Sequence, residues 1–157
     1  MIQKGEMAPS FISVDQQGKE FDSGQLKGKK WVLYFYPKDM TPGCTTQACN
    51  IRDHHQELQS KGITVVGVSM DSVKRHQRFT NKYELPFTLL ADEERKVIDL
   101  FGVWGEKKFM GRVFDGILRT TFVIDEKGEV LEVITRPKTK AHAEEIFAIY
   151  QEKEERK

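Results

Sequence analysis

The residues best suited to chemistry are two cysteines, Cys44 and Cys49, which lie five positions apart and are the only cysteines in the chain. They follow the run Trp31–Tyr36, which is short, aromatic and β-branched and stops at Pro37. Such a run predicts a buried strand that ends in a loop. A thiol just beyond a strand end, near the start of a helix, is in the place where cysteines become reactive.

The helix that carries these cysteines is predicted to begin at Thr41. Threonine is a good N-cap residue, and Pro42 would occupy the first helical position, where a missing N–H costs nothing. Cys44 then lies in the first turn of the helix. There, the unpaired backbone N–H groups and the positive end of the helix dipole favour a thiolate over a thiol.

Helical spacing predicts that the two thiols point in different directions. One apolar stripe that faces the protein carries Cys44, Ala48, Ile51, His55 and Leu58. Cys49 lies about 140° round the helix, and its Cα would be roughly 8–9 Å from that of Cys44. A disulfide needs Cα atoms closer than about 7 Å. The two cysteines therefore cannot bond while this helix is intact.

Length, composition and charge exclude several classes of protein. The 157 residues, 38% of them hydrophobic, suit one domain spanning 1–157, without linkers or repeats. The formal net charge of +1 gives no reason to expect nucleic acid or an anionic membrane as partner. With neither a signal-like N-terminus nor a membrane-length apolar run, we expect a cytoplasmic protein. In a reducing compartment, a disulfide between two cysteines is more typical of catalysis than of structure.

The remaining pattern predicts a mixed α/β fold. We expect strands at 11–14, 31–36, 63–69, 87–90, 119–124 and 129–135, and helices at 42–60, 72–83, 93–101 and from 139 to about 151. The first strand-helix-strand unit implies a parallel pair, and the last two strands form a hairpin that turns at Gly128. The segment Trp104–Met110 is expected to be a loop that packs near the site. This order resembles a thioredoxin fold with insertions and a central mixed sheet.

The pattern Pro37-x-x-x-Thr41-x-x-Cys44 resembles the active-site signature of the peroxiredoxins, which are thiol peroxidases. A second cysteine five residues later is similar to the bacterioferritin comigratory protein, or peroxiredoxin Q, branch. The likeness extends along most of the chain, through the blocks 5–11, 101–107 and 119–125.

The resemblance implies a function without a metal or other cofactor. Cys44 would reduce hydrogen peroxide or an organic hydroperoxide and become a sulfenic acid, and Cys49 would then form an intramolecular disulfide with it. Thioredoxin, or a glutaredoxin, would restore both thiols. A monomer would suffice for this cycle, and a dimer would also be compatible with it.

The resemblance also implies the roles of four further residues. The Thr41 hydroxyl and the N–H groups of Gly43 and Cys44 would hold the peroxide in line with the sulfur. Pro37 would pack over the pocket and shield the thiolate. Arg119 would contact both thiolate and peroxide through its fixed charge and planar donors.

Other interpretations of the same residues remain. Gln47 stands where many peroxiredoxins outside this branch carry glutamate. Its amide can still form hydrogen bonds, so the difference bears only on an electrostatic role at this position. His54 and His55 do not converge with the cysteines as metal ligands, because neighbouring helical residues point about 100° apart. A thiol-disulfide oxidoreductase would call for C-x-x-C. A redox-sensing or chaperone-like binding module is the non-enzyme alternative, and sustained peroxide consumption with thioredoxin distinguishes it from a peroxidase.

Overall fold

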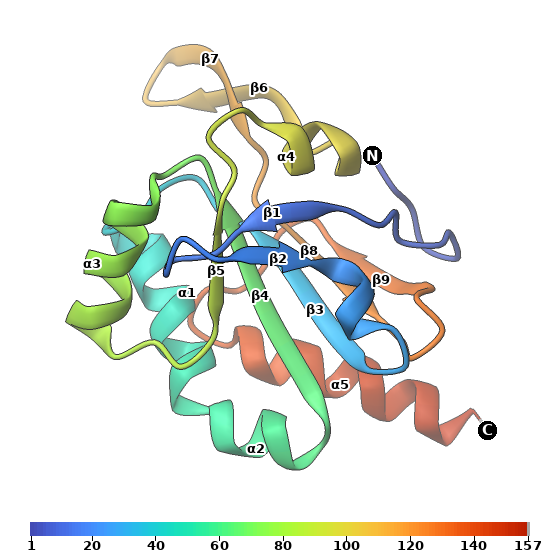
Figure 1. Cartoon of the computed structure of the whole chain (residues 1–157). Helices are drawn as coiled ribbons and strands as arrows, with labels where there is room; N and C mark the ends of the chain where they lie inside the picture. The colour runs from blue at the N-terminus through green and yellow to red at the C-terminus, as the bar shows by residue number, and fades with distance from the viewer. Residues whose placement is uncertain (157) are drawn as a thin grey trace.

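A central five-stranded sheet forms the middle of the molecule in the computed structural model, which describes residues 1–156 (Figure 1). Its strand order is β5-β4-β3-β8-β9. The strands are β3 (Lys30–Phe35), β4 (Ile63–Ser69), β5 (Thr88–Ala91), β8 (Thr120–Ile124) and β9 (Val130–Ile134). The first three are parallel, and β8 and β9 run antiparallel to them. The predicted mixed α/β class is confirmed.

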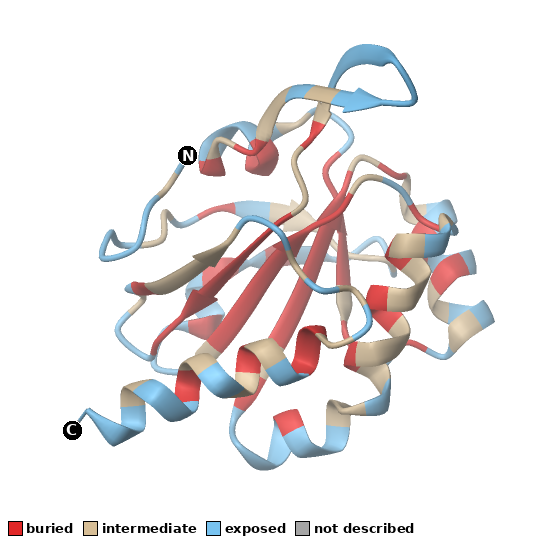
Figure 2. Ribbon diagram, turned by 180° about the vertical axis from the view of Figure 1, so that it is seen from behind, coloured by how far each residue is buried: buried red, intermediate tan, exposed pale blue. Residues whose placement is uncertain are grey.

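The alternation of side chains along β3 builds a core on each face of the sheet. Trp31, Leu33 and Phe35 point to one face, and Val32 and Tyr34 point to the other. A strand that is buried on both faces must be apolar throughout, which explains the unbroken apolar run in the sequence. Figure 2 shows the buried strands enclosed by partly exposed outer elements.

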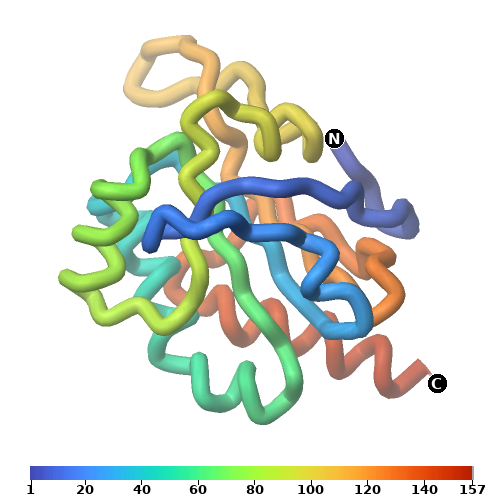
Figure 3. Tube along the Cα trace, viewed as in Figure 1, coloured from blue at the N-terminus to red at the C-terminus, as the bar shows by residue number. Residues whose placement is uncertain are grey.

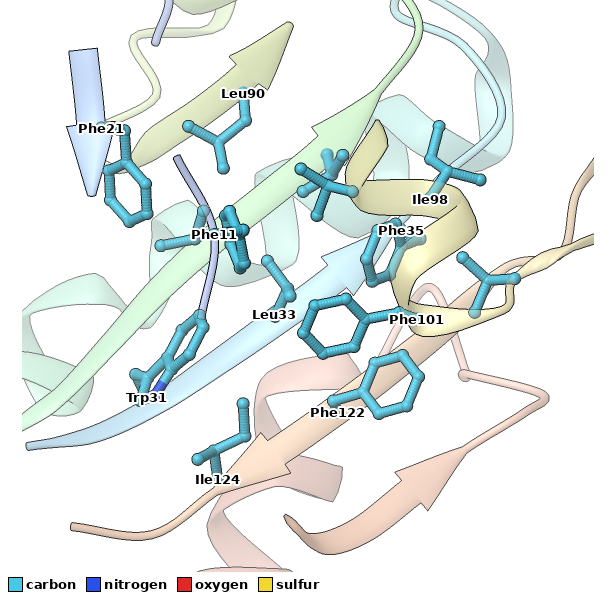
Figure 4. Packing of buried hydrophobic residues seen from close by; sticks show 14 of the residues in the cluster. Phe11, Phe21, Trp31, Leu33, Phe35, Leu90, Ile98, Phe101, Phe122 and Ile124 are labelled. Atoms are coloured by element: carbon cyan, nitrogen blue, oxygen red, sulfur yellow. The ribbon is translucent and has the colours of Figure 1, made fainter. Parts of the chain in front are cut away.

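The first face is covered by short elements and the N-terminal segment (Figure 3). These elements are β1 (Ile12–Val14), β2 (Glu20–Asp22), the 3-10 helix η1 (Ser23–Leu26) and α4 (Lys96–Phe101). The aromatic ring of Phe101 lies at the centre of this core, 5.1 Å from the ring of Phe122 and 5.6 Å from that of Phe35 (Figure 4). Aromatic packing therefore fixes α4 on the sheet.

The second face is covered by helices: α1 (Pro42–Asp53), α2 (His55–Ser60), α3 (Val73–Tyr83) and α5 (His142–Glu155). The core beneath them includes Cys44 and Ile51 from α1. The Tyr150 hydroxyl of α5 reaches the carbonyls of Trp31 and Ile124 at 3.0 and 2.7 Å. Within residues 1–156, none of the helices is long and apolar enough to cross a membrane.

The predicted helix over 42–60 is wrong in one respect, because it breaks at His54. An uninterrupted helix would use the carbonyl of Asn50 to accept the N–H of His54. Here, the His54 ring nitrogen Nδ1 lies 2.8 Å from that carbonyl, and the His54 N–H donates to Ile51 instead. The side chain thus competes with the backbone and ends α1.

The segment Trp104–Met110 is also not the predicted loop. It contains β6 (Trp104–Phe109), which pairs with β7 (Arg112–Ile117) in an antiparallel hairpin. Met110 and Gly111 form the turn with positive φ angles of 52° and 78°. This two-residue turn is of the kind that closes tight hairpins. The sequence pattern missed it because both strands are mostly exposed and lack a regular apolar alternation.

The remaining boundaries differ by a few residues. Helix α4 begins at Lys96 rather than at residue 93, because Arg95 is left-handed (φ 61°) and the Asp92 carboxylate accepts the N–H groups of Val97 and Ile98. Helix α5 begins at His142 rather than near 139 and continues to Glu155 rather than ending near 151.

Candidate active site

The site lies at the edge of the sheet where β3, β4 and β5 end and β8 begins. Parallel strands bring their carboxyl ends to one edge, and an antiparallel neighbour brings its amino end there. Phe35, at the end of β3, is paired with Thr120, at the start of β8. This register places Arg119 beside the loop that leads into α1. The sheet therefore brings together two segments that are far apart in the sequence.

The loop from β3 delivers Thr41 to the start of α1. Thr41 is the N-cap residue, as predicted, but its side chain makes no cap hydrogen bond. Its hydroxyl donates instead to the carbonyl of Lys38 at 2.8 Å. The N–H of Thr45 donates to the Thr41 carbonyl at 2.8 Å and starts the helical ladder. The N–H groups of Gly43 and Cys44 precede this bond, so they have no partner within the helix.

The Cys44 thiol is buried, 2% exposed, and is not in a disulfide. Arg119 Nη2 lies 3.3 Å from its sulfur, in hydrogen-bonding geometry. A guanidinium at this distance is a charged donor, which interacts more strongly with an anionic sulfur than with a neutral one. The first turn of α1 adds its own positive potential. The geometry brings Cys44 and Gly43 together with Arg119, and Thr41 directly precedes this turn as its N-cap.

Gln47 holds Arg119 in this position. Its Oε1 accepts from Arg119 Nη1 at 2.6 Å, and the Gln47 side chain is fully buried. Because an amide is neutral, it orients the guanidinium without cancelling its charge. The sequence did not single out Gln47 as a site residue, although its position one turn after Cys44 placed it on a neighbouring part of the helix.

Gly43 packs closely against Arg119. A Cβ atom at position 43 would lie 3.3 Å from Arg119 Nη2, closer than most Cβ atoms approach any neighbour. A side chain there would shift the guanidinium by a few tenths of an ångström. Pro37 is half-buried at the end of β3, and its shielding role stays a prediction.

Cys49 is also free and is half-buried on α1, in agreement with its predicted place off the buried stripe. The residue after it is tied to the start of α5. Asn50 Nδ2 donates to the carbonyl of Lys140 at 3.0 Å, and Asn50 Oδ1 accepts the N–H of Ala143 at 2.8 Å. Of the two histidines, His54 pairs with Glu144 at 2.8 Å. His55 Nδ1 is buried without a hydrogen-bond partner among the described residues, and burial lowers the pKa of His55.

A second basic residue, Lys107 of β6, is electrostatically coupled to the site. Burial and the like charge of Arg119 lower the pKa of Lys107, while the Cys44 sulfur acts in the opposite direction. Nothing in the sequence indicated Lys107, because its segment lacks a strand pattern. Together with the free N–H groups, these cations make the pocket suited to an anionic sulfur and to negative charge that develops on an adjacent oxygen.

Three comparisons agree on the family. The AhpC/TSA family model matches residues 4–133. The putative peroxiredoxin bcp of Haemophilus influenzae is 49% identical over 143 residues, covering 91% of this chain and 92% of the relative. Peroxiredoxin Bcp of Escherichia coli K12 is 44% identical over 146 residues, covering 93% and 94%. The crystal structure of peroxidoxin BcpB from Mycobacterium tuberculosis has a TM-score of 0.85 at 33% identity and covers 96% and 97%. The predicted thioredoxin-like fold is thereby confirmed.

The contact between Arg119 and Cys44 leads to a first prediction. Arg119→Met should slow the oxidation of Cys44 by hydrogen peroxide about 100-fold, the scale of losing one preorganised charge-stabilising donor. The rate can be followed by stopped-flow mixing of reduced protein with peroxide. Arg136→Met, which removes an exposed arginine, is the matched control and should leave the rate unchanged. Equal rates in the two variants would remove Arg119 from the site.

Proposed function

Because this chain belongs to the AhpC/TSA family of peroxiredoxins, we propose that it is a thiol peroxidase that reduces hydrogen peroxide and organic hydroperoxides through Cys44. The observation that carries the proposal is the Arg119 guanidinium 3.3 Å from a buried sulfur at a helix N-terminus. A buried free cysteine without a function behaves as a small apolar residue and needs no charged partner.

In the first step, the Cys44 thiolate attacks the terminal oxygen of the hydroperoxide. The S–O bond forms as the O–O bond breaks, so sulfur is oxidised by two electrons and the peroxide is reduced. The departing oxygen takes up a proton and leaves as water or an alcohol. Arg119 and the N–H groups of Gly43 and Cys44 would stabilise the negative charge that develops on that oxygen.

The Thr41 hydroxyl has a defined part in this step. Because it donates its proton to the Lys38 carbonyl, its oxygen lone pairs remain to accept a hydrogen bond. The terminal O–H of a hydroperoxide is a suitable donor. Thr41 would therefore orient the oxygen that sulfur attacks, whereas Arg119 stabilises the oxygen that departs.

In the second step, the Cys49 sulfur attacks the Cys44 sulfenic acid. A disulfide forms and the sulfenic oxygen leaves as water, so no further oxidant is needed. Because both cysteines are on α1, one molecule is sufficient. A dithiol protein, for which we propose thioredoxin, would then reduce the disulfide by thiol exchange.

The disulfide step requires α1 to open. Within an intact helix, the two Cα atoms are roughly 8–9 Å apart by ideal geometry, beyond the reach of a disulfide. Opening must also break contacts of the segment after Cys49, namely those of Asn50 with α5 and of Arg52 with the carbonyl of Tyr83 at 2.8 Å. Helix propensity alone therefore underestimates the cost of opening.

The two cysteines should behave differently when each is replaced. Cys44→Ser should abolish peroxide consumption, whereas Cys49→Ser should consume roughly one equivalent and accumulate sulfenic or sulfinic acid, because oxidation then has no resolving step. Mass spectrometry after a peroxide pulse identifies the oxidised residue. Finding the first oxygen on Cys49 instead would reverse the roles.

The oxidised protein should have a locally unfolded helix. We expect residues 44 to 52 to lose amide-exchange protection in the disulfide form, while β3 keeps its protection, because the bond cannot form in the intact helix. Exchange measured on reduced and oxidised protein tests this. Equal protection of 44–52 in both forms would indicate a disulfide between two molecules.

Removing the contacts of Asn50 should speed disulfide formation. Asn50→Ser keeps a similar helix propensity but is too short to bridge to α5, so the sulfenic acid should be resolved about fivefold faster for each ~1 kcal/mol of hydrogen bonding lost. Stopped-flow decay of the sulfenic acid measures the rate. Asn81→Ser, at an exposed position of α3, is the control and should have no effect. A slower rate in Asn50→Ser would mean that these contacts promote resolution.

A further inference from the structure

A buried polar cluster holds the loop between β3 and α1 in place. Asp39 in that loop is 1% exposed, and His76 on α3 is fully buried. His76 Nδ1 lies 2.6 Å from Asp39 Oδ2. An aspartate and a histidine that are both removed from water must form a specific pair to be tolerated in a core.

The hydrogen-bond partners indicate which atoms of this cluster carry protons. His76 Nε2 lies 2.9 Å from the carbonyl of Leu90, which can only accept, so Nε2 carries a proton. One further proton lies between Nδ1 and Asp39 Oδ2. Burial, together with the Asp39 carboxylate, raises the pKa of Tyr36 well above its ordinary value, so the Tyr36 hydroxyl stays protonated. It donates to Asp39 Oδ1 at 2.5 Å.

The backbone of Asp39 is held as well. Its N–H donates to Asp71 Oδ2 at 2.9 Å, and Asp71 also accepts from the Ser69 hydroxyl at 2.6 Å and from Arg75 Nε at 2.8 Å. The side chain and the main chain of this single loop residue are therefore fixed by Tyr36, which directly follows β3, by Asp71 in the connection between β4 and α3, and by His76 on α3.

Hydrogen bonds and an ion pair already engage the atoms of this cluster that could bind a metal. Asp39, Asp71 and His76 offer ligand atoms within 4.8 Å of one another. However, both ring nitrogens of His76 are already engaged, and Arg75 brings a positive charge onto Asp71. The cluster is a satisfied hydrogen-bond network, so its purpose must lie in what it holds.

It holds the approach to Thr41. The residue between them, Met40, has a φ of 68°, a left-handed conformation that costs a side-chain-bearing residue of the order of 1 kcal/mol. Such a bend persists only where its surroundings impose it. The Asp39 anchor immediately precedes the bend, and Thr41 with the first N–H groups of α1 immediately follows it. Releasing Asp39 would let this segment relax and turn Thr41 away.

We propose that Asp39 and His76 are positioning residues for the peroxidase reaction, whose buried pair fixes Thr41 and the first turn of α1 for in-line attack on the peroxide. The proposal rests on the proposed function. It also predicts which property of the site is lost with the pair. Cys44 would remain a reactive thiolate, because Arg119 is held independently by Gln47, but the peroxide would be poorly aligned.

The test uses His76→Leu, Asp39→Ala and the double variant, each in the full-length chain with Cys49→Ser so that only the first step is seen. Each single variant leaves a buried partner unpaired and should lower the melting temperature. The double variant removes both charged groups and should recover much of that loss. The rate of Cys44 oxidation by hydrogen peroxide should nevertheless stay at least ~10-fold below that of the Cys49→Ser parent, because misplacing a reacting group by about 1 Å has effects of this size or larger.

Alkylation of Cys44 by iodoacetamide provides the second measurement, since it needs a thiolate but no aligned peroxide. In the double variant, its rate should stay within about twofold of the parent. Lys153→Met is the matched control, because it also removes the ion-pair partner of a buried carboxylate, that of Asp125, at a position outside the loop. It should lower the melting temperature and leave the peroxide rate unchanged.

Two outcomes would overturn the proposal. If the double variant recovered both stability and the peroxide rate, the pair would serve folding only. If peroxide and alkylation rates fell together, the pair would act on the sulfur and not on alignment. A parent protein whose Cys44 is alkylated but never oxidised by hydroperoxides would instead contradict the proposed function, which keeps the two failures distinct.

Discussion

The 3.3 Å contact between Arg119 Nη2 and the Cys44 sulfur is the interaction on which the arrangement of the site depends. It requires β8 to lie antiparallel beside β3 in one register, with Thr120 opposite Phe35. A slip by one residue would turn Arg119 to the other face of the sheet. The apolar cores on both faces prevent such a slip, because it would expose one set of buried side chains and bury a polar set. The hydrophobic core thus fixes the strand register, and the register places the positive charge of Arg119 beside the sulfur.

The segment before Cys44 and the segment after Cys49 are held by hydrogen bonds of different strength. The approach to Cys44 is fixed by the buried network at Asp39, in which carboxylate groups accept hydrogen bonds at 2.6 to 2.9 Å, and hydrogen bonds to a charged group are the stronger class. The segment after Cys49 is tied down by the neutral side chain of Asn50, bonded to two backbone groups of the α5 region. Neutral contacts of this kind contribute only about 1 kcal/mol each. The side-chain hydrogen bonds of Asn50 are thus weaker than those of the Asp39 network, which would suit the proposed cycle, in which Cys44 stays in place while Cys49 approaches it.

Sequence rules were most successful where the chemistry is local. The strand before Pro37, the N-cap at Thr41 and the burial of Cys44 all follow from residues within one or two turns of each other. Arg119 could not be placed by spacing alone, since its position depends on strand pairing across the sheet, and only the family resemblance indicated it. His76 lies 37 positions after Asp39 in the chain, and their pairing left no signal in either segment. The break at His54 was missed for another reason, because a side chain there takes the carbonyl that periodicity assigns to the backbone.

The charge around the sulfur links the chemistry to the opening of α1. Arg119 donates to the Cys44 sulfur, and Gln47 orients Arg119 without adding a negative charge. In the proposed reaction, a thiolate at Cys44 would attract the Arg119 cation and so stabilise the closed first turn. A neutral sulfenic acid would attract this cation less strongly. A glutamate at position 47 would keep Arg119 paired after oxidation and remove much of this difference. In the proposed cycle, the neutral amide would therefore make the stability of the closed helix depend on the oxidation state of Cys44, so that the first step would favour the movement needed for the second.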